Sequence, residues 1–275
     1  MPESLMLTPK EINDTLVGIG QKKAGLTLFE LFMYAILAGL YIALGAVGAS
    51  VVLAGGVADP GVAKMFAGVV FSTGLILVLL AGAELFTGNM LMTAGFIEKK
   101  FFFVHILRNW AIVWFGNFIG ALLVVFLVFG SGYFFSGEGL SKLGEFLVKT
   151  GDTKMALEFW PAFLRGILCN ILVCLAVVIS LSSISTEGKI LATVFPITVF
   201  IIGGFEHSVA NMFFLPSALM IKGELLEGLV PMFHNLIPVT LGNIVGGVII
   251  VLLHPKSYKR LRKFLAYGKN FNLKY

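Results

Sequence analysis

Four polar side chains lie close together inside a long apolar stretch of the sequence. The stretch runs from about Ile190 to Met220, and its polar members are an acid, an imidazole, a hydroxyl and an amide: Glu206, His207, Ser208 and Asn211. Ionisable groups at membrane depth are costly, so they usually face the interior of a helix bundle or a water-lined path. Histidine can also exchange protons near neutral pH, because its ordinary pKa is about 6.5. The cluster therefore indicates a site for a small solute within a membrane.

Part of this cluster has a second copy earlier in the chain. Four residues recur 122 positions later, Gly82, Glu84, Asn89 and Met90 as Gly204, Glu206, Asn211 and Met212. The glycines at both places predict that a helix is interrupted there. Two interrupted apolar segments in matching halves of a membrane protein are the best sequence indication of a transport site. We therefore expect a small-solute channel or transporter whose pore is built from the two interruptions.

The composition is that of a helical membrane protein. Of the 275 residues, 58% are hydrophobic and 13% are charged, which is typical of several transmembrane helices and excludes a soluble domain. The apolar runs lack the alternation of an outer-membrane barrel, and we expect no secretory signal before the first of them. Cys169 and Cys174 share one apolar run without a metal or redox spacing. We therefore expect neither a metal nor a cofactor.

Six apolar spans follow one another along the chain. Their approximate limits are 28–53, 65–97, 105–133, 160–181, 190–221 and 229–253. The second and the fifth are too long for one straight crossing, and each contains a glycine interruption. Four residues of the third span recur 126 positions later in the sixth, Asn109, Gly116, Asn117 and Gly120 as Asn235, Gly242, Asn243 and Gly246. Because three crossings is an odd number, we expect an all-α integral membrane protein with six transmembrane helices in two inverted three-helix repeats, with helices two and five broken.

Three regions follow from these limits. Residues 1–27 form an N-terminal amphipathic segment, in which Thr8, Pro9 and Glu11 have the pattern of a helix start. Residues 28–255 form the six-helix channel domain, with repeats at about 28–133 and 160–255. Residues 256–275 form a tail with seven lysines or arginines and no acid. Since basic residues are more numerous on the side of the termini, the positive-inside rule places both termini in the cytoplasm, and we expect no nucleic-acid partner.

Four motifs together resemble the formate/nitrite transporter family. They are Glu84-Leu85-Phe86-Thr87-Gly88, Arg165 to Asn170 with Leu172 to Ala176, Gly204 to Met212, and Leu241-Gly242-Asn243. The resemblance extends over essentially all six spans. It implies an aquaporin-like protomer, a homopentamer with one pore in each protomer, and passage of small monovalent anions across the cell membrane. Family members divide mainly into formate, nitrite and hydrosulfide channels. Formate is the leading candidate substrate, because it is the commonest assignment in the family.

The same resemblance implies roles for individual pore residues. These are the central histidine His207, the loop hydroxyl Thr87, the apolar constrictions Phe71, Leu85 and Phe200, the anion-attracting Lys154 and its polar neighbour Asn170. A bare anion loses much of its hydration energy in a low-dielectric constriction, and a proton removes most of that cost. We therefore expect His207 to lend a proton to the anion or to share one with it. The alternative is a structural histidine that only ties down the interrupted backbone.

The other polar residues of the interruptions have a structural interpretation. We expect Glu84 and Glu206 to accept backbone N–H groups freed at each break. We expect Asn89 and Asn211 likewise to hold the chain at their own helix breaks. We expect Asn117 and Asn243 to form hydrogen bonds between the third and sixth spans.

Three rival functions stay open at this point. A membrane-embedded enzyme lacks a second catalytic group at a plausible spacing, and a neutral-solute channel of the aquaporin type usually has Asn-Pro-Ala at both breaks, which this chain does not. A proton-coupled secondary transporter is not separable from a channel by sequence. Gating by the N-terminal segment is also open.

Overall fold

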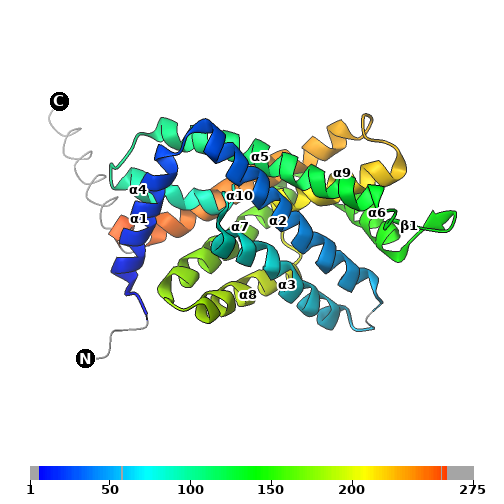
Figure 1. Cartoon of the computed structure of the whole chain (residues 1–275), viewed down its shortest axis with the longest axis horizontal. Helices are drawn as coiled ribbons and strands as arrows, with labels where there is room; N and C mark the ends of the chain where they lie inside the picture. The colour runs from blue at the N-terminus through cyan, green and yellow to red at the C-terminus, as the bar shows by residue number, and fades with distance from the viewer. Residues whose placement is uncertain (1–5, 57, 255, 259–275) are drawn as a thin grey trace.

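The computed structural model describes residues 6–56, 58–254 and 256–258 (Figure 1). The described chain is almost entirely helical. Its helices in order are α1 (Pro9–Gly25), α2 (Leu28–Ala54), α3 (Pro60–Leu77), the π-helical turn η1 (Val78–Gly82), the 3₁₀ turn η2 (Gly88–Met92), α4 (Thr93–Ile97), α5 (Phe103–Gly130), α6 (Lys142–Met155), α7 (Phe159–Ser182), α8 (Thr186–Ile202), α9 (Ser208–Lys222) and α10 (Leu229–Leu253). The strands are one short antiparallel hairpin, β1 (Phe135–Ser136) with β2 (Gly139–Leu140).

Five of these segments are long and apolar enough to cross a membrane. They are α2, Pro60–Gly82, α5, α7 and α10. The predicted fifth span coincides with two shorter helices, α8 with 17 residues and α9 with 15. The described fold is therefore that of an all-helical, multi-pass membrane protein.

The helices pack in two groups that meet in the middle of the molecule. In the first group α2 lies against α3 and α5, and in the second α7 lies against α8 and α10. The groups meet where α3 runs alongside α8, and α9 also contacts α5 (Figure 1). Close approach depends on small residues: a Cβ at Gly39 of α2 would overlap the backbone carbonyl of Asn117, and a Cβ at Gly242 of α10 would overlap that of Phe163. Such contacts hold helices together in lipid, where packing replaces the hydrophobic effect.

Regular helix stops at the two glycine-containing segments. At the last residue of η1, Gly82, the backbone has a φ of +85°, and residues 83–87 are not helical before η2 begins. After α8 it has a φ of +63° at Gly204, and α9 begins at Ser208. Glycine adopts these left-handed conformations without the steric cost of a Cβ. Two short segments are therefore non-helical, and their residues 84–87 and 206–207 are buried within the bundle.

The connection after α5 contains more structure than the sequence predicts. The region between the third and fourth predicted spans holds the hairpin and the helix α6. Ser141 caps α6 by accepting the N–H of Gly144, and the helix buries Leu143 and Leu147, which lie one turn apart. α6 packs on α9 at the opposite end of the molecule from α1 (Figure 1).

The start of the N-terminal helix is confirmed. Thr8 accepts the N–H of Glu11, and the Glu11 carboxylate accepts the backbone N–H of Thr8 at 2.7 Å. The hydrogen bonds from Thr8 lower the pKa of the Glu11 carboxyl from its ordinary value. Farther along α1, Asp14 forms an ion pair with Lys256, whose hydrogen bond lowers the pKa of Asp14. The predicted basic tail otherwise lies outside the described residues.

Candidate functional site

The centre of the candidate site is a contact between Thr87 and His207. Oγ1 of Thr87 lies 3.0 Å from Nε2 of His207, and both side chains are buried. His207 is also the N-cap of α9, where its Nδ1 accepts the backbone N–H of Ala210 at 3.1 Å. Because Nδ1 acts as an acceptor, the ring proton of the neutral imidazole lies on Nε2. The pair thus combines an N–H donor from one non-helical segment with a hydroxyl from the other.

Two phenylalanines pack next to this pair. The ring centroids of Phe200 and His207 are 6.0 Å apart, and Phe71 meets Phe200 edge-on at 5.4 Å. Both phenylalanines are 2% exposed, and so is Leu85, two residues before Thr87. The three residues predicted as constrictions are therefore buried apolar groups, and two of them contact each other beside the imidazole.

Asn170 of α7 holds the backbone of the same region. Its Nδ2 donates to the carbonyl oxygen of Thr87 at 3.1 Å and to that of Asn243 at 2.6 Å. Cys174, one turn farther along α7, lies 3.5 Å from the same Thr87 oxygen. These contacts fix the carbonyl group of Thr87 and so orient its hydroxyl toward His207.

Two asparagines support the non-helical segments in the same way. Asn117 accepts the backbone N–H of Phe86 at 2.9 Å and donates to the carbonyl oxygens of Ala35 and Glu84 at 2.7 and 2.9 Å. Asn243 accepts the backbone N–H of Ser208 at 2.9 Å. It donates to the backbone carbonyl oxygens of Gly166 and Glu206 at 2.8 and 3.0 Å. An amide suits this task because it both donates and accepts.

The predicted role of these asparagines was therefore wrong. Each joins a non-helical segment to a neighbouring helix of its own group, and neither bonds the third span to the sixth. A hydrogen bond between those two helices is instead made by Trp114, whose Nε1 donates to Oγ1 of Thr240 at 3.1 Å.

The two buried glutamates bind side chains. Lys154 donates from Nζ to Glu206 at 2.8 Å, and Asn211 donates to the other carboxylate oxygen at 2.6 Å. The hydrogen bonds found for Glu84 likewise come from side chains, so the prediction that these carboxylates accept freed backbone N–H groups was wrong. A buried carboxylate is better satisfied by a cation, and the asparagines described above already serve the backbone.

Lys23 of α1 is the partner that sequence reasoning missed. Its Nζ lies 2.8 Å from Glu84 and 2.7 Å from Oδ1 of Asn89, which itself donates to Glu84 at 2.8 Å. In the sequence, Lys23 is one of the basic residues on the side of the termini. Lys23 precedes Lys154 by 131 positions, whereas the glutamates are 122 apart. A search for a lysine in each repeat, with a tolerant spacing, would have found it.

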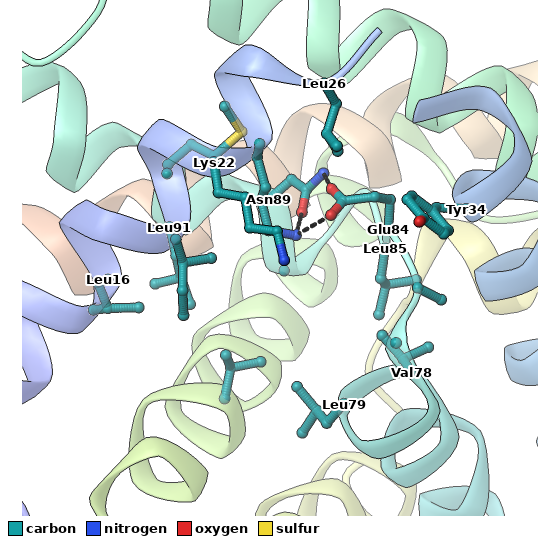
Figure 2. Close-up of a pocket in the computed structure, with 18 of the residues that line it drawn as sticks. Leu16, Lys22, Leu26, Tyr34, Val78, Leu79, Glu84, Leu85, Asn89 and Leu91 are labelled. Atoms are coloured by element: carbon teal, nitrogen blue, oxygen red, sulfur yellow. Dashed lines mark hydrogen bonds and ion pairs between the residues drawn. The ribbon is translucent and has the colours of Figure 1, made fainter. Parts of the chain in front are cut away.

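A cavity of about 620 Å³ opens beside this ion pair. Figure 2 shows Glu84 and Asn89 pointing toward each other, with Tyr34 and Leu85 nearby. Lys23 and Leu16 bring α1 into the cavity wall. The cavity therefore combines an ammonium group with apolar walls. Within the described residues no group of three or more potential metal ligands occurs.

The long apolar helices identify a multi-pass membrane protein, and the ion pairs and the histidine–hydroxyl contact lie between its helices. The chain belongs to the formate/nitrite transporter family, since the sequence profile of that family, described as Formate/nitrite transporter, matches residues 10–255.

Individual relatives agree with this membership. A probable formate transporter of Methanothermobacter thermautotrophicus is 37% identical over 260 residues, covering 89% of this chain and 94% of the relative. A formate channel of Haemophilus influenzae is 36% identical, covering 90% of this chain and 93% of the relative.

Solved structures have the same fold. A pentameric formate channel with formate bound has a TM-score of 0.71 and 36% identity, covering 87% of this chain and 97% of the solved chain. A second ion channel of the family has a TM-score of 0.78 and 28% identity, covering 88% and 96%.

Proposed function

We propose that this protein is a channel for small monovalent weak-acid anions, with formate as the leading substrate. The observation that carries the proposal is the Thr87–His207 contact, which places two hydrogen-bonding groups in the interior of an apolar bundle. The names of the relatives support formate in particular, because the two relatives described above are a formate channel and a probable formate transporter. Nitrite and hydrosulfide are the alternatives within the family.

The path of the anion follows from the charges and the apolar groups. The ammonium groups of Lys154 and Lys23 attract the anion toward the two ends of the pore. The first amides of α9 add the positive end of a helix dipole near His207. Phe71, Leu85 and Phe200 then exclude water, which raises the cost of a bare charge and favours a protonated solute.

His207 shares the proton on Nε2 with the passing anion. Its Nδ1 already accepts the N–H of Ala210, so a second proton on Nδ1 would break the cap of α9. His207 could either lend a proton to the anion as an imidazolium or share one with it as a neutral imidazole. The contact with Ala210 favours sharing. The hydroxyl of Thr87 completes the donor set for the anion.

The proposed architecture has six crossings in two inverted three-helix repeats, with helices two and five broken. It is supported by matched sets of contacts, in which Asn117 and Lys23 serve the first non-helical segment as Asn243 and Lys154 serve the second. Regions 28–133 and 160–255 are the proposed repeats of a domain at 28–255. Residues 1–27 and 256–275 then lie on the cytoplasmic face of the cell membrane.

We also propose a homopentamer with one pore in each protomer, since a solved relative is described as pentameric. The alternative from a different functional class is a membrane-embedded enzyme. A channel moves its solute unchanged, whereas an enzyme converts it, so the two differ in an assay that follows both the amount and the identity of the solute.

The test is a flux assay in liposomes that contain the purified protein. Formate, nitrite, hydrosulfide and acetate are each measured at several pH values, with protein-free liposomes as the control. We expect formate to pass unchanged and fastest, accompanied by protons. Faster nitrite or hydrosulfide flux would replace formate by that anion, and flux no greater than in protein-free liposomes would overturn the channel assignment.

A further inference from the structure

A closed ring of hydrogen bonds surrounds Lys154, near the end of α6. Its ammonium group donates to Glu206 at 2.8 Å, and Asn211 donates to the second oxygen of that carboxylate at 2.6 Å. Asn211 also donates to Oδ1 of Asn235 at 2.7 Å. Nδ2 of Asn235 then donates to the backbone carbonyl of Lys154 at 2.8 Å, which closes the ring.

The ring is buried except at the lysine. Asn235 and Asn211 are fully buried, while the Lys154 side chain keeps 15% of its exposure. Lys154 lies in the last turn of α6, where helix carbonyls lack partners within the helix. Its carbonyl oxygen accepts the backbone N–H of Leu157, just beyond the helix, at 3.2 Å and has a second lone pair for Asn235. The bond from Asn235 of α10 therefore anchors the end of α6 to a long membrane-embedded helix.

The matching cluster around Lys23 is held differently. Lys23 donates to both Glu84 and Asn89, whereas Lys154 has one hydrogen bond to a side chain and lies 5.5 Å from the ring centre of Phe214. Asn109, which corresponds to Asn235, accepts from Asn89, but its own Nδ2 has no hydrogen-bond partner among the described residues. The cluster around Lys23 therefore fixes the ammonium group of its lysine, whereas the cluster around Lys154 fixes the backbone of its lysine.

We propose that Asn235 is a positioning residue for the anion-binding step: it fixes the backbone of Lys154 while the ammonium group keeps donors for an incoming anion. An ammonium has three donors, and Glu206 takes one of those on Lys154. If the end of α6 moved, the same ammonium would meet the anion at a variable distance. This inference rests on the proposed anion-channel function.

The variant Asn235→Asp tests the anchor. Aspartate keeps the oxygen that Asn211 donates to and removes the donor to the Lys154 carbonyl. We expect the half-saturating formate concentration to rise about fivefold, as for one lost hydrogen bond, with a smaller change in maximal flux. Asn235→Ser serves as a second variant, because a hydroxyl restores a donor without adding a charge. We expect its half-saturating concentration to lie between those of the wild type and Asn235→Asp.

The decisive measurement combines these variants with Lys154→Met. If Asn235 acts through Lys154, Asn235→Asp raises the half-saturating concentration in the wild type and has no further effect in the Lys154→Met background. A purely structural role gives the same effect in both backgrounds and overturns the inference. Failure of both Asn235 variants to fold also overturns it, since the role would then be structural.

Asn109→Asp is the matched control from the other cluster. Its effect on half-saturation is expected to be equal in the presence and in the absence of Lys154→Met, because Asn109 has no bond to Lys154. A wild-type protein without formate flux would overturn the proposed function, and this inference with it. Formate flux in the wild type with equal effects of Asn235→Asp in both backgrounds would overturn the inference alone.

Discussion

Thr87 and His207 face each other at 3.0 Å although 120 residues separate them in the chain. The contact depends on two non-helical segments that approach each other inside the bundle. Each segment is held by an asparagine on a neighbouring helix, and Asn170 holds the carbonyl of Thr87. The donors are therefore fixed before any solute arrives, which lowers the cost of reorganisation on binding.

Removing the hydroxyl of Thr87 should weaken formate passage. Thr87→Val keeps the shape of the side chain and removes the group next to Nε2. We expect formate permeability in liposomes to fall about tenfold, since a hydrogen bond to a charged group contributes about 1.5 kcal/mol or more. Thr93→Val is the control, because among the described residues its hydroxyl bonds the carbonyl of Met90 and no other group. Equal permeability of the Thr87 and Thr93 variants would contradict the proposed donor role.

Replacing His207 should change the pH dependence of flux. In His207→Asn the amide oxygen can still accept the N–H of Ala210, because asparagine is a favourable N-cap, but the side chain no longer exchanges protons. In the wild type, a second proton taken up by Nδ1 at low pH would break the cap of α9 and lower the flux. We expect His207→Asn to fold and to lose this fall in flux at low pH. His207→Ala also removes the cap, at a cost of about 1 kcal/mol in stability. Flux–pH profiles identical to the wild type in both variants would show that His207 shares no proton.

The sequence predicted family membership and the membrane class, because composition and motif order are local properties of the chain. The start of α1 was also predictable, since a capping box involves residues only three apart. The ion pair between Lys23 and Glu84 was not, because it depends on how α1 lies over the bundle. Helix α6 was missed because its apolar face is short and lies within a polar segment.

The two asparagines predicted to join the third and sixth spans illustrate the same limit. Repeat matching singled out Asn117 and Asn243 but assigned them the wrong partners, because a repeat shows which residues correspond and not which groups they touch. Both asparagines bind backbone atoms, and because every residue carries these atoms, the residue types do not show which of them are bound. The roles of Lys154, Asn170 and the three constriction residues in passage stay predictions.

Loss of the backbone-binding asparagines should destabilise the fold. Asn243→Leu leaves one buried N–H and two carbonyl groups without their side-chain partner, and Asn117→Leu does the same in the other half. We expect each to cost about 3 kcal/mol or more, since an unsatisfied buried group costs about 1–3 kcal/mol. Thermal unfolding in detergent measures this. Ser50→Ala, which removes one hydroxyl bonded within its own helix, is the control, and unfolding at the same temperature as this control would contradict the prediction.

The close helix crossings should not tolerate an added methyl group. Gly242→Ala places a Cβ against the carbonyl of Phe163, whereas Gly18→Ala on α1 meets nothing within 4 Å. We expect Gly242→Ala to destabilise the protein by about 1–3 kcal/mol through overpacking. Gly18→Ala should be neutral or stabilising by up to about 1 kcal/mol, because alanine favours helix. The same thermal unfolding assay compares the two, and equal stabilities would mean that the crossing can relax.

Shortening a proposed constriction should relax selection by size. Phe200→Val removes the ring that contacts both Phe71 and His207, and should let the larger acetate pass more readily relative to formate. Phe195→Val is the matched control, because Phe195 lies on the same helix and is 70% exposed. The measurement is the ratio of acetate to formate flux in liposomes, which cancels differences in the amount of inserted protein. We expect the ratio to rise for Phe200→Val and to stay at the wild-type value for Phe195→Val. An unchanged ratio in Phe200→Val would place the narrowest part of the path away from this aromatic pair.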